Sequence, residues 1–450
     1  MTLRFGTDGV RGVANLDLTP ELVVALGRAA ARVLGVDRFV VGRDTRVSGP
    51  MLEAALVAGL TAEGVAVQTL GVVPTPAVAW AAVHHHAAGA VISASHNRYP
   101  DNGIKLFTPE GRKLDDDVEA VLEATLDALV HGHAAGERID AEQSPTGDAI
   151  GTVLALADPL GGYADGIVAS IAGRDLSGLR LVVDCANGAA STIAPEVLRR
   201  LGATVTVLHA EPNGTNINEG CGSTHPAGLQ HAVVEQGADV GLAFDGDADR
   251  LVAVDAAGEL VDGDQIIAIC AVDLHERGTL RRDAVVVTVM SNLGFRLAMQ
   301  ARGITVVETP VGDRWVLDAL RSGGYSIGGE QSGHVIFADL ATTGDGLLTA
   351  VQLLDVVRRS GRPLSELAAV MARLPQVLRN VRVSAAVADL DARIAAHVEA
   401  ARDALGDTGR VLVRRSGTEP LVRVMVEAPT ADEAVAVADQ LAAAVSAAAS

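Results

Sequence analysis

Residues 240–250 read VGLAFDGDADR, an uninterrupted apolar run that ends in three carboxylates. Asp245, Asp247 and Asp249 alternate with small residues, a spacing that can direct three oxygen ligands toward one cation. Oxygen donors suit magnesium better than zinc, which prefers His and Cys. A solvated acidic turn is the alternative, but three like charges directly after an apolar strand are costly without a cation. The stretch therefore predicts a strand followed by a magnesium-binding loop.

Outward from this stretch, short β-branched runs alternate with helical patterns along most of the chain. This alternation is typical of βα units and a largely parallel sheet, so we expect an α/β fold. A first set of elements is predicted as strands at 38–41, 65–70 and 90–92 with a helix at 51–63. A second set is predicted as strands at 179–183, 204–208 and 240–244.

A hairpin at 251–254 and 259–261 is predicted to open a third set, which continues with strands at 284–289, 305–308 and 325–328. After a linker near 360–363 the pattern changes to a smaller α+β unit. With 450 residues the chain is too long for one ordinary core, since domains hold roughly 100 to 200 residues. We therefore expect four domains, at 1–150, 151–250, 251–365 and 366–450, three with related mixed α/β sheets and a smaller C-terminal one.

Polar, glycine-containing loops near Ser95, Asp245, Glu330 and Ser416 each follow a strand in a different segment. Ligand sites in α/β sheets lie beyond the carboxyl ends of strands. Four domains can therefore direct these loops at one central cleft, where a small-molecule ligand would bind.

The composition narrows the range of partners and the location. A formal net charge of -20 argues against nucleic-acid and anionic-membrane surfaces, which need basic patches. The chain lacks the roughly 20 uninterrupted apolar residues of a membrane span. Cys185, Cys221 and Cys270 are too few and too widely separated for a disulfide framework, which indicates buried thiols in a reducing compartment. We expect a cytoplasmic protein.

The loop at 93–97 reads SASHN and is followed by DNGIK at 101–105. The hydroxyl of Ser95 on a tight loop can accept a phosphoryl group, with a metal neutralising charge. Lys105 is then placed for proton transfer or phosphate contact. Alone, this loop is also compatible with an ordinary turn, because Ser and Asn are common turn residues.

The loop at 328–334 reads GGEQSGH and offers a carboxylate, a hydroxyl and an imidazole from Glu330, Ser332 and His334. Such a set suits sugar hydroxyls, and the adjacent glycines permit close backbone approach. A hairpin turn with a capping glutamate is the alternative interpretation.

The loop at 414–420 reads RRSGTEP, with a further arginine at position 423. Guanidinium groups, hydroxyls and a glycine N–H make it a candidate site for a phosphate. A basic turn on an edge hairpin is the alternative. The residues expected to hold the phosphate are Arg414, Ser416, Gly417, Thr418 and Arg423.

Together these loops resemble those of the α-D-phosphohexomutase superfamily, and the resemblance covers essentially the whole chain. It implies four domains around a central cleft, a phosphorylated Ser95, and magnesium held by Asp245, Asp247, Asp249 and a phosphoserine oxygen. Lys105 and His334 are the implied acid/base groups.

Further implied contacts come from the same resemblance. The opening segment FGTDGVRG, at 5–12, would bring Arg11 to the reacting phosphate, and Arg250, Glu330, Ser332 and His334 are expected to contact the substrate. Arg414, Ser416, Gly417, Thr418 and Arg423 would hold its second phosphate. The chain departs from the superfamily at Arg98, where proline is usual.

Three short segments are similar to the phosphoglucosamine mutase subgroup. They are NIN at 216–218, CGST at 221–224 and SNLG at 291–294. This similarity implies interconversion of glucosamine 6-phosphate and glucosamine 1-phosphate through a 1,6-bisphosphate, feeding UDP-N-acetylglucosamine and cell-wall synthesis. A hexose 1,6-bisphosphate activator and a homodimer are further implications.

Three alternatives stay open from the sequence. A phosphomannomutase or phosphoglucomutase would share every step except hexose choice. A non-catalytic phosphosugar sensor would bind without isomerisation, and a phosphatase would release inorganic phosphate.

Overall fold

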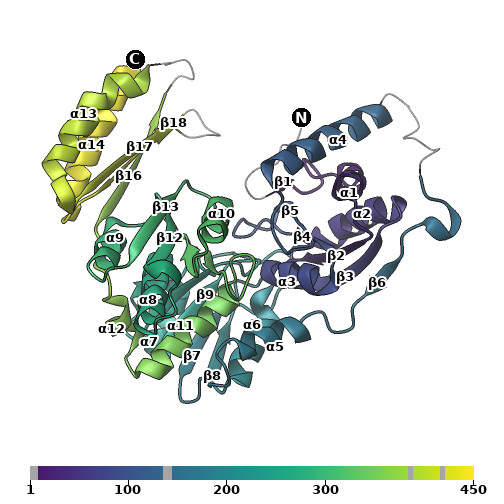
Figure 1. Ribbon diagram of the computed structural model, residues 1–450, viewed down its shortest axis with the longest axis horizontal. Helices are drawn as coiled ribbons and strands as arrows, with labels where there is room; N and C mark the ends of the chain where they lie inside the picture. The colour runs from purple at the N-terminus through teal and green to yellow at the C-terminus, as the bar shows by residue number, and fades with distance from the viewer. Residues whose placement is uncertain (1–8, 135–143, 384–388, 416–420, 450) are drawn as a thin grey trace. The chain divides into compact units, whose positions relative to one another are not determined.

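The computed structural model describes residues 9–134, 144–383, 389–415 and 421–449. The chain divides into two compact units, the first formed by Met1–Val289 with Thr305–Ala369 and the second by Met290–Ile304 with Val370–Ser450. The described residues form four sheets of six, five, four and three strands (Figure 1). The predicted α/β fold class, with mixed sheets and a smaller C-terminal α+β part, is confirmed.

The first sheet has the strand order β1-β5-β4-β2-β3-β6. Strands β2, β3, β4 and β6 run parallel, whereas β1 and β5 are antiparallel to their neighbours. Its strands are β1 (Val10–Val13), β2 (Arg38–Arg43), β3 (Ala66–Val72), β4 (Ala88–Ile92), β5 (Asp101–Phe107) and β6 (Val153–Ala155). The helices of this segment are α1 (Pro20–Leu34), α2 (Gly49–Ala62), α3 (Thr75–His85), α4 (Asp116–Ala134) and the short η1 (Gly147–Ala149).

Helices α1 and α2 pack closely because glycines face each other. A Cβ atom on Gly59 would lie 2.2 Å from the carbonyl oxygen of Val24, and one on Gly27 would lie 2.5 Å from that of Leu56. Helix α1 begins after Thr19, whose hydroxyl accepts the Leu22 N–H, and ends at the left-handed Gly35.

The second sheet has the order β11-β10-β9-β7-β8. Strand β7 runs parallel to β8 and β9, and every residue of β9 is buried. Its strands are β7 (Arg180–Asp184), β8 (Thr204–Leu208), β9 (Val240–Phe244), β10 (Leu251–Asp255) and β11 (Leu260–Val261). The helices are α5 (Gly161–Ala169), α6 (Ala190–Arg200) and α7 (Ala227–Gln236).

The predicted grouping of the hairpin at 251–254 and 259–261 is wrong. The hairpin of β10 and β11 does not open a third set, because β10 pairs antiparallel with β9 in the second sheet. Leu251 lies opposite Phe244 and Asp255 opposite Val240, so the aspartate loop is itself the connection between paired strands. The predicted domain limits stay predictions.

The third sheet has the order β13-β12-β14-β15, with β15 antiparallel. Its strands are β12 (Ala284–Thr288), β13 (Thr305–Thr309), β14 (Ile327–Gly329) and β15 (Val335–Phe337). The helices of this part of the chain are α8 (Gly263–Glu276), η2 (Arg281–Asp283), α10 (Asp313–Gly323), α11 (Gly346–Ser360) and α12 (Leu364–Ala368). Asp262 and Gln265 form a reciprocal capping box that begins α8.

The second unit contains an antiparallel sheet of order β16-β18-β17 (Figure 1). Buried Glu427 joins its two chain segments, accepting the Leu293 N–H at 2.9 Å and the Arg410 Nε–H at 3.0 Å. Its elements are α9 (Leu293–Gln300), β16 (Gln376–Arg382), α13 (Leu390–Leu405), η3 (Gly406–Thr408), β17 (Arg410–Arg415), β18 (Leu421–Glu427) and α14 (Ala431–Ala449).

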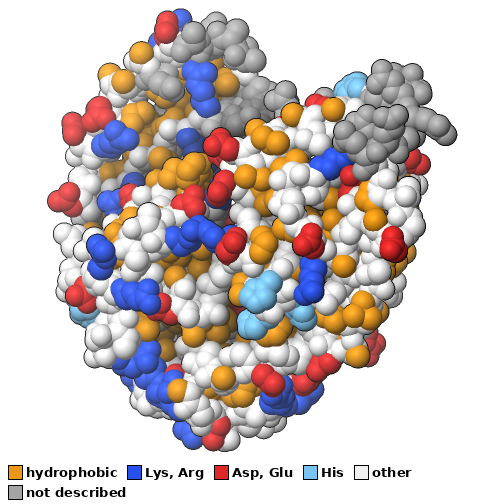
Figure 2. Space-filling model, turned by 45° about the vertical axis from the view of Figure 1, so that its right-hand side comes forward, with side chains coloured by type: hydrophobic (Ala, Val, Ile, Leu, Met, Phe, Trp, Pro, Cys, Tyr) orange, Lys and Arg blue, Asp and Glu red, His pale blue; other side chains and the backbone are white. Residues whose placement is uncertain are grey.

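The surface charges, the cysteines and the helices can be compared with the predictions made from composition. On the face drawn in Figure 2, Lys and Arg side chains are interspersed with Asp and Glu. Cys185, Cys221 and Cys270 are free and buried, as predicted. Within the described residues, no helix has both the length and the apolar character needed to cross a membrane. The cytoplasmic location stays a prediction.

Candidate active site

Ser95 lies in a strained turn at the carboxyl end of the fully buried strand β4. Its φ of 51° falls in the left-handed region that non-glycine residues rarely occupy. The Ser93 hydroxyl accepts the Ser95 N–H at 3.0 Å and donates to Asp44 at 2.6 Å. Ser95 is only 1% exposed. The turn therefore holds a specific hydroxyl inside the protein instead of presenting it to bulk water.

The Ser95 hydroxyl donates to Oδ2 of Asp245 at 2.5 Å, which joins the serine loop to the aspartate loop. Asp245, Asp247 and Asp249 are all buried, and each offers a carboxylate oxygen within 4.8 Å of the others. Burial, then repulsion by the two neighbouring carboxylates, raises the pKa of Asp245 well above its usual range. Three such groups are costly to bury unless positive charge compensates them.

The aspartate loop fits a hard divalent cation. Oδ1 of Asp247 and Oδ1 of Asp249 are buried and make no hydrogen bond within the described part of the chain. Unsatisfied buried carboxylate oxygens are rare in proteins, and here they belong to an all-oxygen group. Magnesium prefers such oxygens as ligands. The three aspartates are therefore a candidate metal site.

Lys105 supplies one positive charge to this group from strand β5. Its Nζ donates to Asp247 Oδ2 at 2.8 Å and lies 3.4 Å from Asp249 Oδ2. Arg11 lies on β1 opposite Gly103, two residues before Lys105, so both side chains project from the same face of the sheet. The sequence analysis placed 101–105 after the serine loop without assigning them to an element, and the structure places them in strand β5, between β1 and β4.

His334 reaches the aspartates from the turn between β14 and β15. Its Nδ1 lies 3.7 Å from Asp249 Oδ2, and its Nε2 accepts the Gly344 N–H at 3.1 Å. In the neutral ring this contact uses a lone pair on Nε2 and leaves the proton on Nδ1, whereas the Asp313 carboxylate, 3.4 Å from Nε2, favours a proton there as well. Burial lowers the pKa of His334, but the hydrogen bond and charge of Asp249 outweigh it, so the net shift is upward.

The remaining predicted substrate residues of the first unit are Glu330, Ser332 and Arg250. Glu330 Oε1 accepts the Gly312 N–H at 3.1 Å, and Ser332 is exposed. Arg250 Nη1 lies 3.2 Å from His96 Nδ1. Burial, then the charge of Arg250, lowers the pKa of His96, which favours the neutral ring next to Ser95.

The predicted phosphate loop belongs to the second unit. Arg414 and Arg423 lie opposite each other on β17 and β18. Burial, then repulsion by Arg423, lowers the pKa of the Arg414 guanidinium. Two cations facing each other favour an anion between them. The other predicted members, Ser416, Gly417 and Thr418, lie outside the described residues.

The sequence analysis assigned no site role to four residues that contact these loops, although one of them, Asn218, lies in the NIN segment at 216–218. The Thr75 hydroxyl donates to Asp247 Oδ2 at 2.6 Å, and Asp44, Arg46 and Asn218 bond the serine loop. Asp44 and Arg46 follow directly after strand β2, so the rule that used strand ends to find Ser95 could have found them. Arg98 is exposed.

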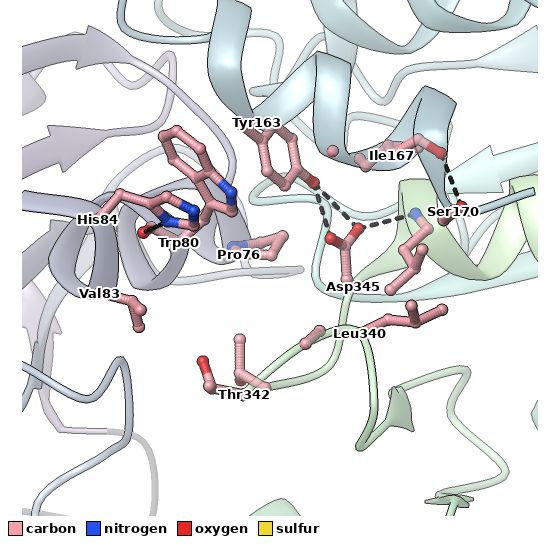
Figure 3. Close-up of a pocket in the computed structure, with 14 residues that line it drawn as sticks. Pro76, Trp80, Val83, His84, Tyr163, Ile167, Ser170, Leu340, Thr342 and Asp345 are labelled. Atoms are coloured by element: carbon pink, nitrogen blue, oxygen red, sulfur yellow. Dashed lines mark hydrogen bonds between the residues drawn. The ribbon is translucent and has the colours of Figure 1, made fainter. Parts of the chain in front are cut away.

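The buried pair of Tyr163 and Asp345 lies next to a backbone contact with the aspartate loop. The Tyr163 hydroxyl lies 3.0 Å from Oδ1 and 2.9 Å from Oδ2 of Asp345, which also caps α11 (Figure 3). The next residue, Gly346, donates its N–H to the Ala248 carbonyl at 3.0 Å. Burial raises the pKa of Asp345 to about 6. The pair borders a cavity of about 170 Å³ that Trp80 and Leu340 also line.

Four domain models of the phosphoglucomutase/phosphomannomutase type match the chain. Alpha/beta/alpha domain I matches residues 2–131, domain II matches 162–258, domain III matches 262–374 and the C-terminal domain matches 378–444. The phosphoglucosamine mutase of Frankia alni is 55% identical over 462 aligned residues, covering 100% of this chain and 99% of the relative. The chain belongs to the phosphoglucosamine mutase family. The resemblance inferred from the loops is thereby confirmed.

Other members of the phosphoglucosamine mutase family are equally similar. That of Pelotomaculum thermopropionicum is 55% identical and covers 95% of each chain. A phosphoglucomutase/phosphomannomutase family structure from Burkholderia thailandensis aligns with a TM-score of 0.81 at 26% identity, covering 98% of this chain and 97% of its own. The Aspergillus fumigatus N-acetylphosphoglucosamine mutase in complex with GlcNAc-6P and magnesium shares the fold, with a TM-score of 0.71 at 19% identity over 100% of this chain and 96% of its own. As a family member, the chain is a phosphohexomutase-type isomerase.

Proposed function

We propose that this protein interconverts glucosamine 6-phosphate and glucosamine 1-phosphate through a phosphorylated Ser95 and a 1,6-bisphosphate intermediate. The observation that carries the proposal is the hydrogen bond from the Ser95 hydroxyl to Asp245, within a buried group of three aspartates. A hydroxyl at this position is held where a phosphoester would face a cation site. The 55% identity to phosphoglucosamine mutases supports the choice of hexose.

Each half of the reaction transfers one phosphoryl group. The bond between phosphorus and the Ser95 oxygen breaks while a bond to the sugar hydroxyl forms, and the hydroxyl proton passes to a base. Reversal from the other end of the bisphosphate restores phosphoserine. Lys105 and His334 are our candidates for moving these protons, because both are buried beside the aspartates. Arg11, on the same face as Lys105, is proposed to contact the reacting phosphate.

Asp245, Asp247 and Asp249, with an oxygen of phospho-Ser95, are the proposed ligands of magnesium. When bound, the ion would offset charge on the phosphoryl group as it moves between oxygens. The two unsatisfied oxygens of Asp247 and Asp249 support this assignment. Lys105 compensates part of the negative charge whether or not the ion is present.

The rest of the proposed site recognises the sugar and its second phosphate. Glu330, Ser332, His334 and Arg250 are proposed to contact the hexose. The facing arginines Arg414 and Arg423, with Ser416, Gly417 and Thr418, are proposed to hold the phosphate that is not being transferred. A hexose 1,6-bisphosphate activator, a homodimer and a cytoplasmic location are parts of the same proposal.

The test measures isomerisation of glucosamine 6-phosphate, with glucose and mannose phosphates as competing substrates. We expect turnover of the amino sugar to exceed that of the others, loss of at least 1,000-fold activity in Ser95→Ala, and a phosphate on Ser95 by peptide mass mapping. Ser322→Ala, which removes an exposed helix hydroxyl, is the matched control. Full activity in Ser95→Ala would overturn the proposal. Steady release of inorganic phosphate would instead favour a phosphatase, and tight binding without isomerisation a sensor.

A further inference from the structure

The carbonyl groups of the serine loop converge on the side chains of Arg46 and Asn218. Arg46 Nη2 donates to the carbonyls of Ser95 at 3.0 Å and Asn97 at 2.9 Å. Asn218 Nδ2 donates to the same two carbonyls, at 2.8 Å and 2.9 Å. A carbonyl oxygen has two lone pairs, so both carbonyls are fully used by this pair of side chains.

Arg46 is saturated as well. Its Nε donates to Asp44 Oδ2 at 2.7 Å, and its Nη1 donates to the carbonyls of Arg98 and Asp101. All five guanidinium N–H groups are therefore bonded, four of them to the backbone between residues 95 and 101. Arg46 is 1% exposed, and its partner Asp44 is fully buried. Lysine carries three donors on one atom and cannot reproduce this fork.

Asn218 lies in the loop between β8 and α7, and its own conformation is held by further hydrogen bonds. Its φ of 58° is left-handed, and its N–H donates to the Ala186 carbonyl at 2.9 Å. The buried carboxylate of Asp184 accepts the N–H group of Ala186, the residue that Asn218 contacts, at 2.9 Å. It also accepts the N–H group of Gly222, in the loop that carries Asn218, at 2.9 Å. The loop that carries Asn218 is thus anchored independently of the serine loop.

We infer that Arg46 and Asn218 are positioning residues that hold Ser95 in its left-handed conformation. The φ of Ser95 is unfavourable for a residue with a side chain, so it persists only where surrounding contacts fix it. Releasing the two carbonyls lets the turn relax and moves the Ser95 hydroxyl away from Asp245. The inference deepens the proposed function and rests on it, because Ser95 is the proposed phosphoryl carrier.

The consequence is a specific kinetic signature. Neither Arg46 nor Asn218 belongs to the proposed sugar or phosphate contacts, so the KM for the hexose phosphate should change by less than about twofold. Misplacing a reacting atom by about 1 Å can cost about 100-fold in rate, so kcat should fall roughly 10- to 100-fold. Loss of folded protein would also lower the apparent kcat at constant KM, so the readout that separates local positioning from general stability is faster amide exchange confined to the serine loop.

The experiment compares Asn218→Gly and Arg46→Lys with two matched controls, in the full chain. Glycine accommodates the left-handed backbone and removes the side chain that carries the amide. Asn216→Ala removes an amide that bonds only within its own loop, and Arg43→Lys alters an arginine of the same strand end that pairs with Glu53. Steady-state kinetics and amide hydrogen exchange of the peptide covering 93–103 are measured for each.

We expect Asn218→Gly and Arg46→Lys to lower kcat at constant KM and to speed exchange of this peptide at least tenfold. Both controls should behave like the wild type. Wild-type kcat and exchange in a folded Asn218→Gly protein would overturn the inference, and so would an equal effect in the controls. If Arg46→Lys does not fold, Asn218→Gly decides alone. Absence of isomerisation in the wild type would overturn the proposed function, while the exchange measurement would still test the positioning.

Discussion

Lys105 Nζ lies 2.8 Å from Asp247 Oδ2, and both side chains are buried. This ion pair joins strand β5 of the first sheet to the loop after β9 of the second. Lys105 also lies 3.4 Å from Asp249, so one cation serves two carboxylates of the proposed metal site. Any cation bound by the aspartates must share them with this ammonium group.

Replacing Lys105 by methionine removes the positive charge and keeps a long, unbranched side chain. Without magnesium, the variant leaves buried carboxylates uncompensated, so we expect a loss of about 3 to 5 kcal/mol in the free energy of unfolding. Removal of the competing cation should also tighten magnesium binding while turnover collapses. Thermal unfolding with and without magnesium, together with isomerase assays, checks this. Weaker magnesium binding in Lys105→Met would contradict the assignment.

Magnesium should stabilise the folded protein through the aspartate loop. A ligand present at 100 times its Kd adds about 2.7 kcal/mol to the free energy of unfolding. We expect an increase in Tm on adding magnesium to chelator-treated protein, and no increase in Asp245→Asn. Asp239→Asn, which changes an aspartate paired with Arg180 near the surface, is the control. An unchanged magnesium response in Asp245→Asn would remove this residue from the site.

Gly344 is predicted to be irreplaceable because it touches His334. A Cβ atom there would lie 2.3 Å from His334 Nε2, and the ring is buried and cannot move freely. We expect Gly344→Ala to cost about 1 to 3 kcal/mol of stability and to lower kcat by at least tenfold, roughly 1.4 kcal/mol in the barrier.

The matched control is Gly228→Ala in helix α7. A Cβ atom at Gly228 has nothing within 4 Å, so this substitution should be neutral or slightly stabilising. Wild-type kcat in Gly344→Ala would show that the position of His334 does not matter for the reaction.

Asp345 should make stability depend on pH. Its pKa is raised from 3.8 to about 6, chiefly by burial, so the folded state binds a proton that the unfolded state releases. Its contribution to stability is present below about pH 4 and is lost as pH rises through about 6, by an amount on the order of 3 kcal/mol. The wild type should therefore gain stability relative to Asp345→Asn as pH falls from 7 to 4. Denaturant unfolding of both proteins across this range measures the difference, and a constant difference would contradict the raised pKa.

The sequence by itself determined the α/β class and the family, and it predicted the loops that are proposed to carry the chemistry. Each depends on residues that are contiguous in the chain: an apolar strand, then DGDAD at 245–249 or SASHN at 93–97. Local periodicity and local chemistry are sufficient for such features, because a strand and the loop that follows it are adjacent by covalent connection.

Only the tertiary structure decided which loops meet and which strands pair. Ser95 and Asp245 are 150 residues apart, and nothing near either residue specifies a contact between them. The hairpin after residue 250 was assigned to the wrong set of strands for the same reason, since a strand's neighbour is set by long-range packing. Neither Arg46 nor Asn218, which lies in the NIN segment at 216–218, shows in the sequence that the fold brings both to the Ser95 carbonyl. Backbone carbonyls carry no sequence signal, so their partners become visible only when the folded chain satisfies every buried polar group.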